Sequence, residues 1–142
     1  MAIATYDDAN MILRLYELRR EEKMRTAREW FAKNARFQTW EDLQRIAPPG
    51  TTENAYFRQV TSHYEMVASF ITNGVIHPEL FFQSGRELLM VWVRIEKLVP
   101  EIRERYQDPS QFRNLEQVAH QFVEYMGRLG PDVYEAFRKR IG

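Results

Sequence analysis

The chain has 142 residues, of which 44% are apolar, 28% charged and 13% aromatic, and its 20 basic residues balance 20 acidic ones. This length suits one domain, and the aromatic content excludes a disordered chain. A net charge of zero argues against binding nucleic acid by neutralising phosphates, and the absence of cysteine excludes disulfides, thiolate zinc sites and cysteine nucleophiles. We therefore expect a single domain over residues 1–142.

Neither a signal peptide nor a membrane span is expected. The N-terminus, MAIATYDD, has no basic start followed by an apolar run. The best apolar run, Leu88 to Val93, is far shorter than the roughly 18 residues that a span requires. Together with the lack of cysteine, these features predict a cytoplasmic protein without a membrane partner.

The first predicted helix extends from Thr5 to Asn34. Thr5 is suited to the N-cap position, with Asp8 three residues later completing an acidic capping arrangement. Apolar residues at helical spacing occur toward both ends of the helix, and the charged segment 19–23 interrupts them. Two interpretations remain: a solvated middle on a peripheral helix, or a helix that reaches past its own domain to a partner.

The next two predicted helices are separated by a turn rich in proline. The first is short, covers residues 39–46, and ends before Pro48-Pro49-Gly50 because neither proline can continue the hydrogen-bond ladder. The second covers residues 53–73 after an N-cap at Thr51 or Thr52, and has one continuous apolar stripe from Tyr56 to Ile71, with polar residues on its other face.

A helix over residues 78–99 follows and holds the densest apolar block of the sequence. Asn73-Gly74 suits a helix C-cap, and Pro78 suits the first turn of the next helix. Because the turn between them is short, helices 53–73 and 78–99 should pack as an antiparallel hairpin at the centre of the fold.

Two side chains of the helix over 78–99 carry specific expectations. Trp92 should be buried at the centre of the fold. Glu87 should lie near the buried side of its helix, where it would need Arg94 or an arginine from another helix as its partner.

Three further helical segments are predicted beyond Pro100. They cover residues 101–106, 108–127, opened by Asp108-Pro109, and 131–140. No strand-like alternation occurs anywhere in the sequence. The predicted fold is therefore an all-α bundle of about four principal helices plus short ones, in which residues 1–50 form the N-terminal part and residues 51–142 the core hairpin and C-terminal helices.

The sequence has no catalytic or cofactor motif of a known kind, and no cofactor is expected. Glu116 and His120 are four residues apart on one predicted helix face, where a carboxylate and an imidazole could bind a metal or share a proton. Helical di-metal sites instead use two Glu-x-x-His motifs, which this chain lacks, so a chance surface pair is the other interpretation. His63 is expected in the core with a hydrogen bond, and His77 as a turn residue or weak cap.

The aromatic residues admit two interpretations. They could line an apolar ligand pocket between helices, or they could simply form the core. The residues concerned are Phe81, Phe82, Trp92, Phe112, Phe122 and Tyr125.

Several short motifs of the chain resemble those of a bacterial family of small helical domains of unknown function. They are the segment from Asn73-Gly74-Val75-Ile76 through Phe82, then Trp92, Leu98, Pro100, Ile102 and Arg103, and then Asn114-Leu115-Glu116. The resemblance covers about residues 53 to 126 and implies an all-helical fold. His77-Pro78 departs from the acidic residue expected after the turn, and Leu115 stands where the family favours an aromatic residue. The resemblance implies no catalytic residues.

Three functions remain open. The first is a non-enzymatic interaction module that binds an unknown protein partner or forms a homodimer. A first helix of about 45 Å would exceed a body of roughly 37 Å in diameter, so one apolar end of that helix would need to be covered by a second chain.

The second possible function is an enzyme that binds a small ligand or a metal. The third, nucleic-acid binding through the basic residues at 19–28, is weakened by the acidic residues among them. The interface candidates are Ile12, Leu15, Tyr16, Trp30 and Phe31.

Overall fold

The computed structural model describes residues 3–142, which form nine helices and no strand. Met1 and Ala2, with which the predicted domain begins, lie outside the described residues. The predicted all-α bundle is confirmed, and no helix in the described part of the chain is long and apolar enough to cross a bilayer. The helices are α1 (Tyr6–Arg20), α2 (Glu22–Asn34), α3 (Trp40–Ile46), α4 (Thr52–Thr72), α5 (Pro78–Phe82), α6 (Arg86–Ile95), α7 (Val99–Tyr106), α8 (Arg113–Leu129) and α9 (Val133–Ile141).

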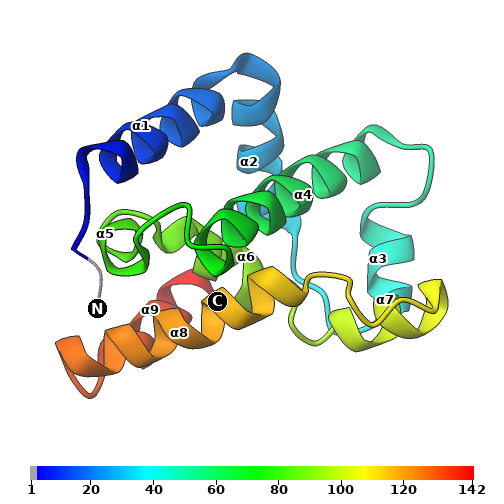
Figure 1. The fold of residues 1–142 in the computed structure, drawn as a ribbon. Helices are drawn as coiled ribbons and strands as arrows, with labels where there is room; N and C mark the ends of the chain where they lie inside the picture. Colours follow the sequence, from blue (N-terminus) through cyan, green and yellow to red (C-terminus); the bar gives the residue numbers. More distant parts are fainter. Residues whose placement is uncertain (1–2) are drawn as a thin grey trace.

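Helix α4 is the central element of the bundle. It packs against α2 on one side and α8 on the other, while α6 contacts α8, α9 and α4 (Figure 1). Helices α3 and α7 lie together at one end of the molecule, to the right in Figure 1. Trp92 of α6 is only 6% exposed, so its predicted burial is confirmed.

Several helix ends follow local signals in the sequence. Thr5 and Thr39 each form a capping box with the aspartate three residues later. Gly74 adopts a left-handed φ of 76° after α4, as a glycine C-cap requires. His77 caps α5 because its Nδ1 accepts a hydrogen bond from the Leu80 N–H at 3.2 Å, which confirms its predicted role.

The single helix predicted for residues 5–34 is wrong, because the chain turns at Glu21. This residue has an extended ψ of 139°, and its carboxylate caps α2 by accepting a hydrogen bond from the Met24 N–H at 2.9 Å. Leu15 and Met24 are both buried although they are nine residues apart. In one straight helix they would point in opposite directions, at about 100° per residue, so only a break lets both reach the core.

The helix predicted for residues 78–99 is also interrupted, between α5 and α6. Gly85 is the N-cap of α6 and lies against the buried ring of Phe81. A Cβ atom placed on Gly85 would come within 2.4 Å of that ring. The Ser84 carbonyl accepts a hydrogen bond from the Tyr16 hydroxyl, so the interruption also attaches α1. The second arm of the predicted hairpin is therefore two helices.

Alanine at Gly85 should destabilise the protein, whereas alanine at Gly127 should stabilise it. The first change pushes a methyl group into the Phe81 ring, and such overpacking costs about 1–3 kcal/mol. The second adds a methyl group inside α8 where nothing lies within 4 Å, and removing a helical glycine gains about 0.5–1 kcal/mol. Urea denaturation of the two variants measures both effects. If both substitutions changed the free energy of unfolding equally and in the same direction, the close contact between Gly85 and Phe81 would be contradicted.

The start of α8 differs from the prediction as well. Residues 108–112 form a turn in which Asp108 accepts hydrogen bonds from the Ser110 N–H and hydroxyl, at 2.9 and 2.6 Å. These two bonds, together with a hydrogen bond from the Gln111 side-chain amide at 3.0 Å, lower the pKa of Asp108. Asp108 therefore stabilises the turn, and α8 begins five residues later than expected.

Candidate functional site

Glu116 and His120 are engaged separately. The Glu116 carboxylate accepts a hydrogen bond from Arg103 at 2.9 Å, in an ion pair between α7 and α8. The exposed His120 ring packs edge-on against Trp92, with ring centroids 6.4 Å apart. Among the described residues, no group of three or more acidic or histidine side chains could hold a metal ion. We therefore propose no metal site at this pair.

Three of the five predicted interface residues belong to the core of their own chain. Ile12, Leu15 and Phe31 are buried, and Phe31 has no exposed surface. Tyr16 and Trp30 are half-buried, the former bound to Ser84 and the latter packed on Tyr56 with ring centroids 6.1 Å apart. The break at Glu21 turns Ile12, Leu15 and Phe31 toward the core of their own chain.

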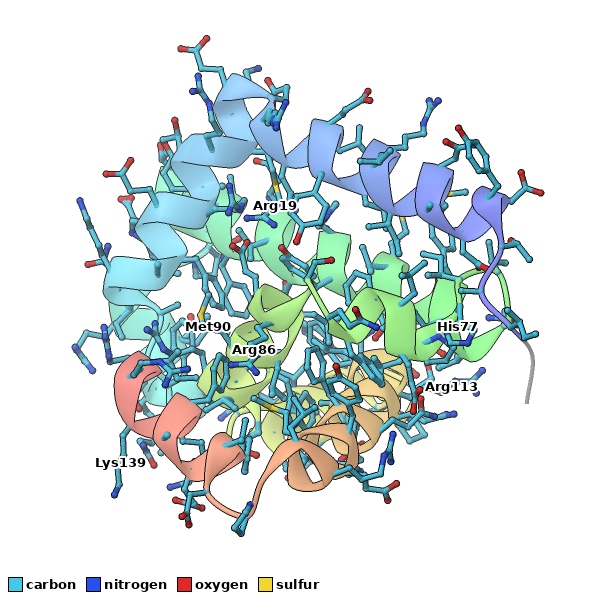
Figure 2. All side chains as sticks on the ribbon, turned by 90° about the vertical axis from the view of Figure 1, so that its left-hand side faces the viewer. Arg19, His77, Arg86, Met90, Arg113 and Lys139 are labelled. Carbon is cyan, nitrogen blue, oxygen red and sulfur yellow. The ribbon has the colours of Figure 1, made fainter. Side chains whose placement is uncertain are left out.

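Glu87 has arginine partners from other helices, as one of the two alternatives predicted. Its carboxylate binds Arg28 at 2.6 and 2.7 Å, Arg19 at 3.2 Å and the Tyr64 hydroxyl at 2.8 Å. Burial raises the pKa of Glu87, but these hydrogen bonds and charges outweigh it, so the pKa lies below its ordinary value. Figure 2 shows Arg19 on the inner side of α1, facing the body of the protein. The cluster joins α1, α2, α4 and α6.

His63 lies beside this cluster, half-buried and edge-on to Tyr64 at 4.9 Å between ring centroids. Burial lowers its pKa, because the charged imidazolium loses its hydration there. The nearby carboxylate of Glu87 accepts its hydrogen bonds from Arg19, Arg28 and Tyr64 and none from His63. These contacts describe a structural junction of four helices.

Arg94, the other predicted partner of Glu87, has a different role. It is 7% exposed and donates hydrogen bonds to the carbonyls of Phe31, Ala35 and Ile141, at 2.8–3.3 Å. These carbonyls belong to the C-terminal ends of α2 and α9, where a positive charge complements the helix dipole. Arg94 therefore joins two helix ends to α6.

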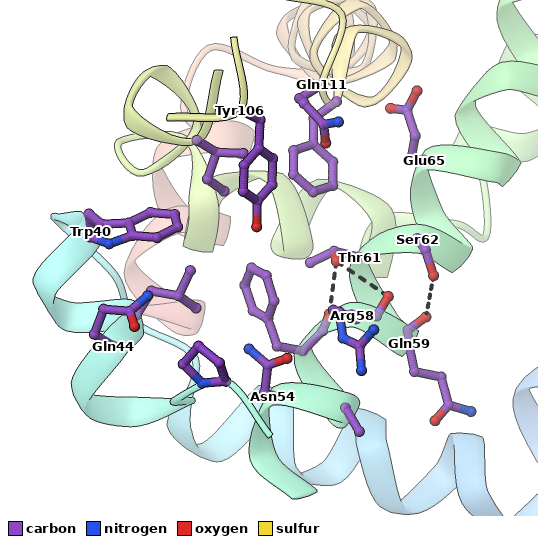
Figure 3. Close-up of a pocket in the computed structure, with 16 residues that line it drawn as sticks. Trp40, Gln44, Asn54, Arg58, Gln59, Thr61, Ser62, Glu65, Tyr106 and Gln111 are labelled. Carbon is purple, nitrogen blue, oxygen red and sulfur yellow. Dashed lines mark hydrogen bonds between the residues drawn. The ribbon is translucent and has the colours of Figure 1, made fainter. Parts of the chain in front are cut away.

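A groove of about 950 Å³ lies between α3, α4 and α7. Its floor consists of the buried side chains of Leu43, Phe57 and Ile102. Figure 3 shows the polar and aromatic side chains that surround it. They are Trp40 and Gln44 from α3, Asn54, Arg58, Gln59, Thr61, Ser62 and Glu65 from α4, and Tyr106 and Gln111 from the α7 side.

One wall of the groove is an aromatic pair. Trp40 of α3 and Tyr106 of α7 meet edge to face, with ring centroids 6.2 Å apart, and Tyr106 remains 60% exposed. Arg105 lies over the Trp40 ring at 4.7 Å, and the backbone N–H of Trp40 donates a hydrogen bond to the Glu101 carboxylate at 3.3 Å. These contacts hold α3 and α7 together at a distance from α4, and so keep the groove open.

The opposite wall is the N-terminal half of α4. The Thr61 hydroxyl donates to the Phe57 carbonyl at 2.8 Å, so this buried polar group is satisfied within its own helix. Arg58 is exposed at the mouth, and its guanidinium makes no ion pair within the described chain. The wall thus presents one uncompensated positive charge beside an apolar floor.

The third wall is the turn before α8, which has an unusual backbone. Phe112 lines the groove with a left-handed φ of 59°, a conformation that is strained for an aromatic residue. Arg103 fixes this turn by donating to the Gln111 carbonyl at 2.9 Å and to Glu116 at 2.9 Å. The ring of Phe112 is thereby aimed at the groove.

The residues behind the family resemblance support this wall. Asn114 donates to the Glu65 carboxylate at 2.8 Å, and the Leu115 N–H donates to the same carboxylate at 2.8 Å. The Thr72 hydroxyl donates to the Asn114 side-chain oxygen at 2.7 Å. Glu65 of α4 therefore caps α8, and the Asn114-Leu115-Glu116 motif locks α8 to α4 and α7.

The sequence did not reveal the groove. Of the six aromatic residues considered for a pocket, only Phe112 lines it, and Phe81, Phe82 and Phe122 are buried elsewhere. The available signal in the sequence was an aromatic residue, Tyr106, at the end of a short predicted helix and just before the Asp108-Pro109 turn.

No curated protein and no solved structure matches the chain. A family model described as a domain of unknown function matches residues 4–122, which include every wall of the groove and the Arg103–Glu116 pair. The expectation of a small helical domain of unknown function is thereby confirmed. The chain belongs to the DUF4760 family.

Proposed function

We infer that the protein is a non-enzymatic, cytoplasmic interaction module whose groove between α3, α4 and α7 binds an amphipathic helix of a partner protein. The observation that carries this inference is an open groove with an apolar floor, an exposed aromatic wall and one uncompensated arginine at its mouth. Grooves of this kind between helices accept apolar side chains at positions i, i+3 or i+4, and i+7 of a helical ligand.

The walls favour a helical ligand over an extended one. They are built mainly from α3, α4 and α7, whose backbone groups are hydrogen-bonded within their own helices. An extended peptide would bury N–H and C=O groups without partners, whereas a helix satisfies its own backbone. The volume of about 950 Å³ has room for several apolar side chains of such a helix.

Charge adds a second criterion. Arg58 has no ion pair within the described chain, and Glu65, the acidic residue of the lining, is bound to Asn114 and the Leu115 N–H. The ligand that fits best therefore carries an acidic residue next to its apolar face. A guanidinium at the edge of an apolar site favours such a partner and disfavours a basic one.

Selection from a displayed library of amphipathic helices tests the proposal. Helices enriched against the wild-type protein should have apolar residues at helical spacing and an acidic neighbour. Ala55 is exposed and lines the groove, so Ala55→Trp should fill it and abolish binding of the selected peptide in a calorimetric titration. Ala32→Trp, at an exposed position of α2 outside the groove, is the matched control and should leave the affinity unchanged.

Charge reversal provides the second arm of the same test. Arg58→Glu should weaken the peptide by about tenfold, a typical effect of unfavourable charge at the edge of an interface. Arg25→Glu on the exposed surface of α2 is its control. Peptides that bind Ala55→Trp as tightly as the wild type would place recognition elsewhere. If the groove instead bound a small apolar carboxylate more tightly than any helical peptide, the ligand would be that small molecule and the proposal of a helix would be wrong.

A further inference from the structure

Helix α1 has apolar side chains on two opposite faces. Ile12 and Leu15 face the core and are buried, whereas Tyr6 and Leu13 face outward and are 83% and 60% exposed. Ile3, just ahead of the helix, is 87% exposed. Large apolar side chains at such exposure gather on α1 more than on other helices of the described chain, and contiguous exposed apolar surface marks interaction sites.

The outward residues have the spacing of a helix-pairing seam. Tyr6, Asn10 and Leu13 follow one another at intervals of four and three residues, and all are exposed. Such a 4–3 alternation keeps side chains on one line along a helix that packs against another helix. A polar Asn within an apolar seam is a known means of fixing the register of two paired helices.

Charged residues beside the seam select the orientation. Asp7 and Arg14 are seven residues apart on the same side of α1, both exposed, and neither forms an ion pair within residues 3–142. In a parallel pair of identical helices, these residues of the two copies would lie on opposite sides of the seam and would not meet. In an antiparallel pair, Asp7 of one copy lies toward Arg14 of the other, twice over by symmetry.

We propose that a second copy of this chain pairs with the outer face of α1, through an antiparallel two-fold contact of α1 with α1. The surface differs from the one predicted from the sequence, since it uses Tyr6 and Leu13 rather than Ile12 and Leu15. It is also separate from the groove, because α1 lies at the opposite side of the molecule from α3 and α7 (Figure 1). Each copy in the pair keeps its groove accessible.

Sedimentation velocity of the wild-type chain tests the pairing. At a concentration of about 100 µM, the average mass should approach twice the 17.1 kDa of one chain. Leu13→Glu should return the mass to that of one chain, with an unchanged circular dichroism spectrum because Leu13 is exposed. Leu129→Glu, at a 53% exposed position of α8, is the matched control and should leave association intact. A wild-type chain that stays at 17.1 kDa, or a dimer that survives Leu13→Glu, overturns the proposal.

Charge exchange then tests the orientation. Asp7→Arg and Arg14→Asp should each weaken association by about tenfold, because each single change places like charges together in the antiparallel pair. The double variant restores both attractive pairs and should recover the wild-type affinity. If the double variant instead lost as much association free energy as the two single variants together, the antiparallel contact would be overturned. Ala55→Trp, which blocks the groove, should leave all of these masses unchanged, so the two proposals fail independently.

Discussion

Replacement of Phe31 by alanine should destabilise the protein by about 3–5 kcal/mol, the usual range for a large aromatic side chain removed from a core. Phe31 is fully buried near the C-terminal end of α2, and it belongs to the main core together with residues of α4 and α6. Its backbone carbonyl also accepts a hydrogen bond from Arg94, which the substitution leaves in place. The expected loss therefore comes from packing alone, and urea denaturation followed by circular dichroism measures it.

Trp30→Ala is the natural comparison for this prediction. Trp30 neighbours Phe31 in the sequence but is half-buried and packs at the edge of the core on Tyr56. Its truncation should therefore cost less, about 1–2 kcal/mol. If the loss for Phe31→Ala were smaller than that for Trp30→Ala, the inward turn of α2 would be wrong.

The helix boundaries that were predicted correctly depend on interactions within a few residues. Thr5, Thr39 and His77 cap helices through side chains that accept hydrogen bonds from N–H groups three residues later. Gly74 ends α4 because it can adopt a positive φ. Each of these features is complete within one short segment, so the sequence alone predicts it.

The two helix breaks depend on contacts that the sequence does not display. The segment at residues 19–23 appeared as a charged gap in an apolar stripe, but the change of helix direction follows from the need to bury both Leu15 and Met24. The break at Gly85 likewise follows from the position of the Phe81 ring. A mid-helix glycine is compatible with a continuous helix, and only tertiary packing decides between the two outcomes.

The groove was beyond prediction for a related reason. Its walls bring α3 and α4 together with α7 and the turn after it, which come much later in the chain, and this turn depends on the left-handed backbone of Phe112. Local propensity disfavours that conformation for an aromatic residue, so only the contacts of Arg103 with Gln111 and Glu116 account for it. Departures from local preference concentrate where a fold positions a functional surface, in agreement with the role proposed for the groove.

Replacement of Glu87 by glutamine should destabilise the protein by about 3 kcal/mol, at the lower end of the range for breaking a buried ion pair because the Glu87 side chain is 19% exposed. The change keeps the shape of the side chain but leaves Arg19 and Arg28 without their counter-charge. Substitution of all three residues by methionine should recover part of the loss, since an apolar cluster has no unpaired charge. Thermal unfolding at pH 7 compares the three proteins. A stability of Glu87→Gln equal to that of the wild type would contradict the buried cluster.

The pH dependence of this difference identifies its electrostatic origin. Although burial raises the pKa of Glu87, hydrogen bonds from Arg28 and Tyr64 and the charge of Arg19 bring it below its ordinary value of 4.5. A carboxyl group whose pKa is lower in the folded state stabilises that state fully above its unfolded pKa, and this contribution is lost as pH falls through the folded pKa. The stability difference between wild type and Glu87→Gln should therefore be constant above about pH 6 and shrink below 4.5. A difference caused by altered packing alone would persist unchanged into the acid range, because glutamine does not titrate and its shape matches that of glutamate. Urea denaturation of both proteins at closely spaced values of acidic pH thus separates the charge of Glu87 from its volume.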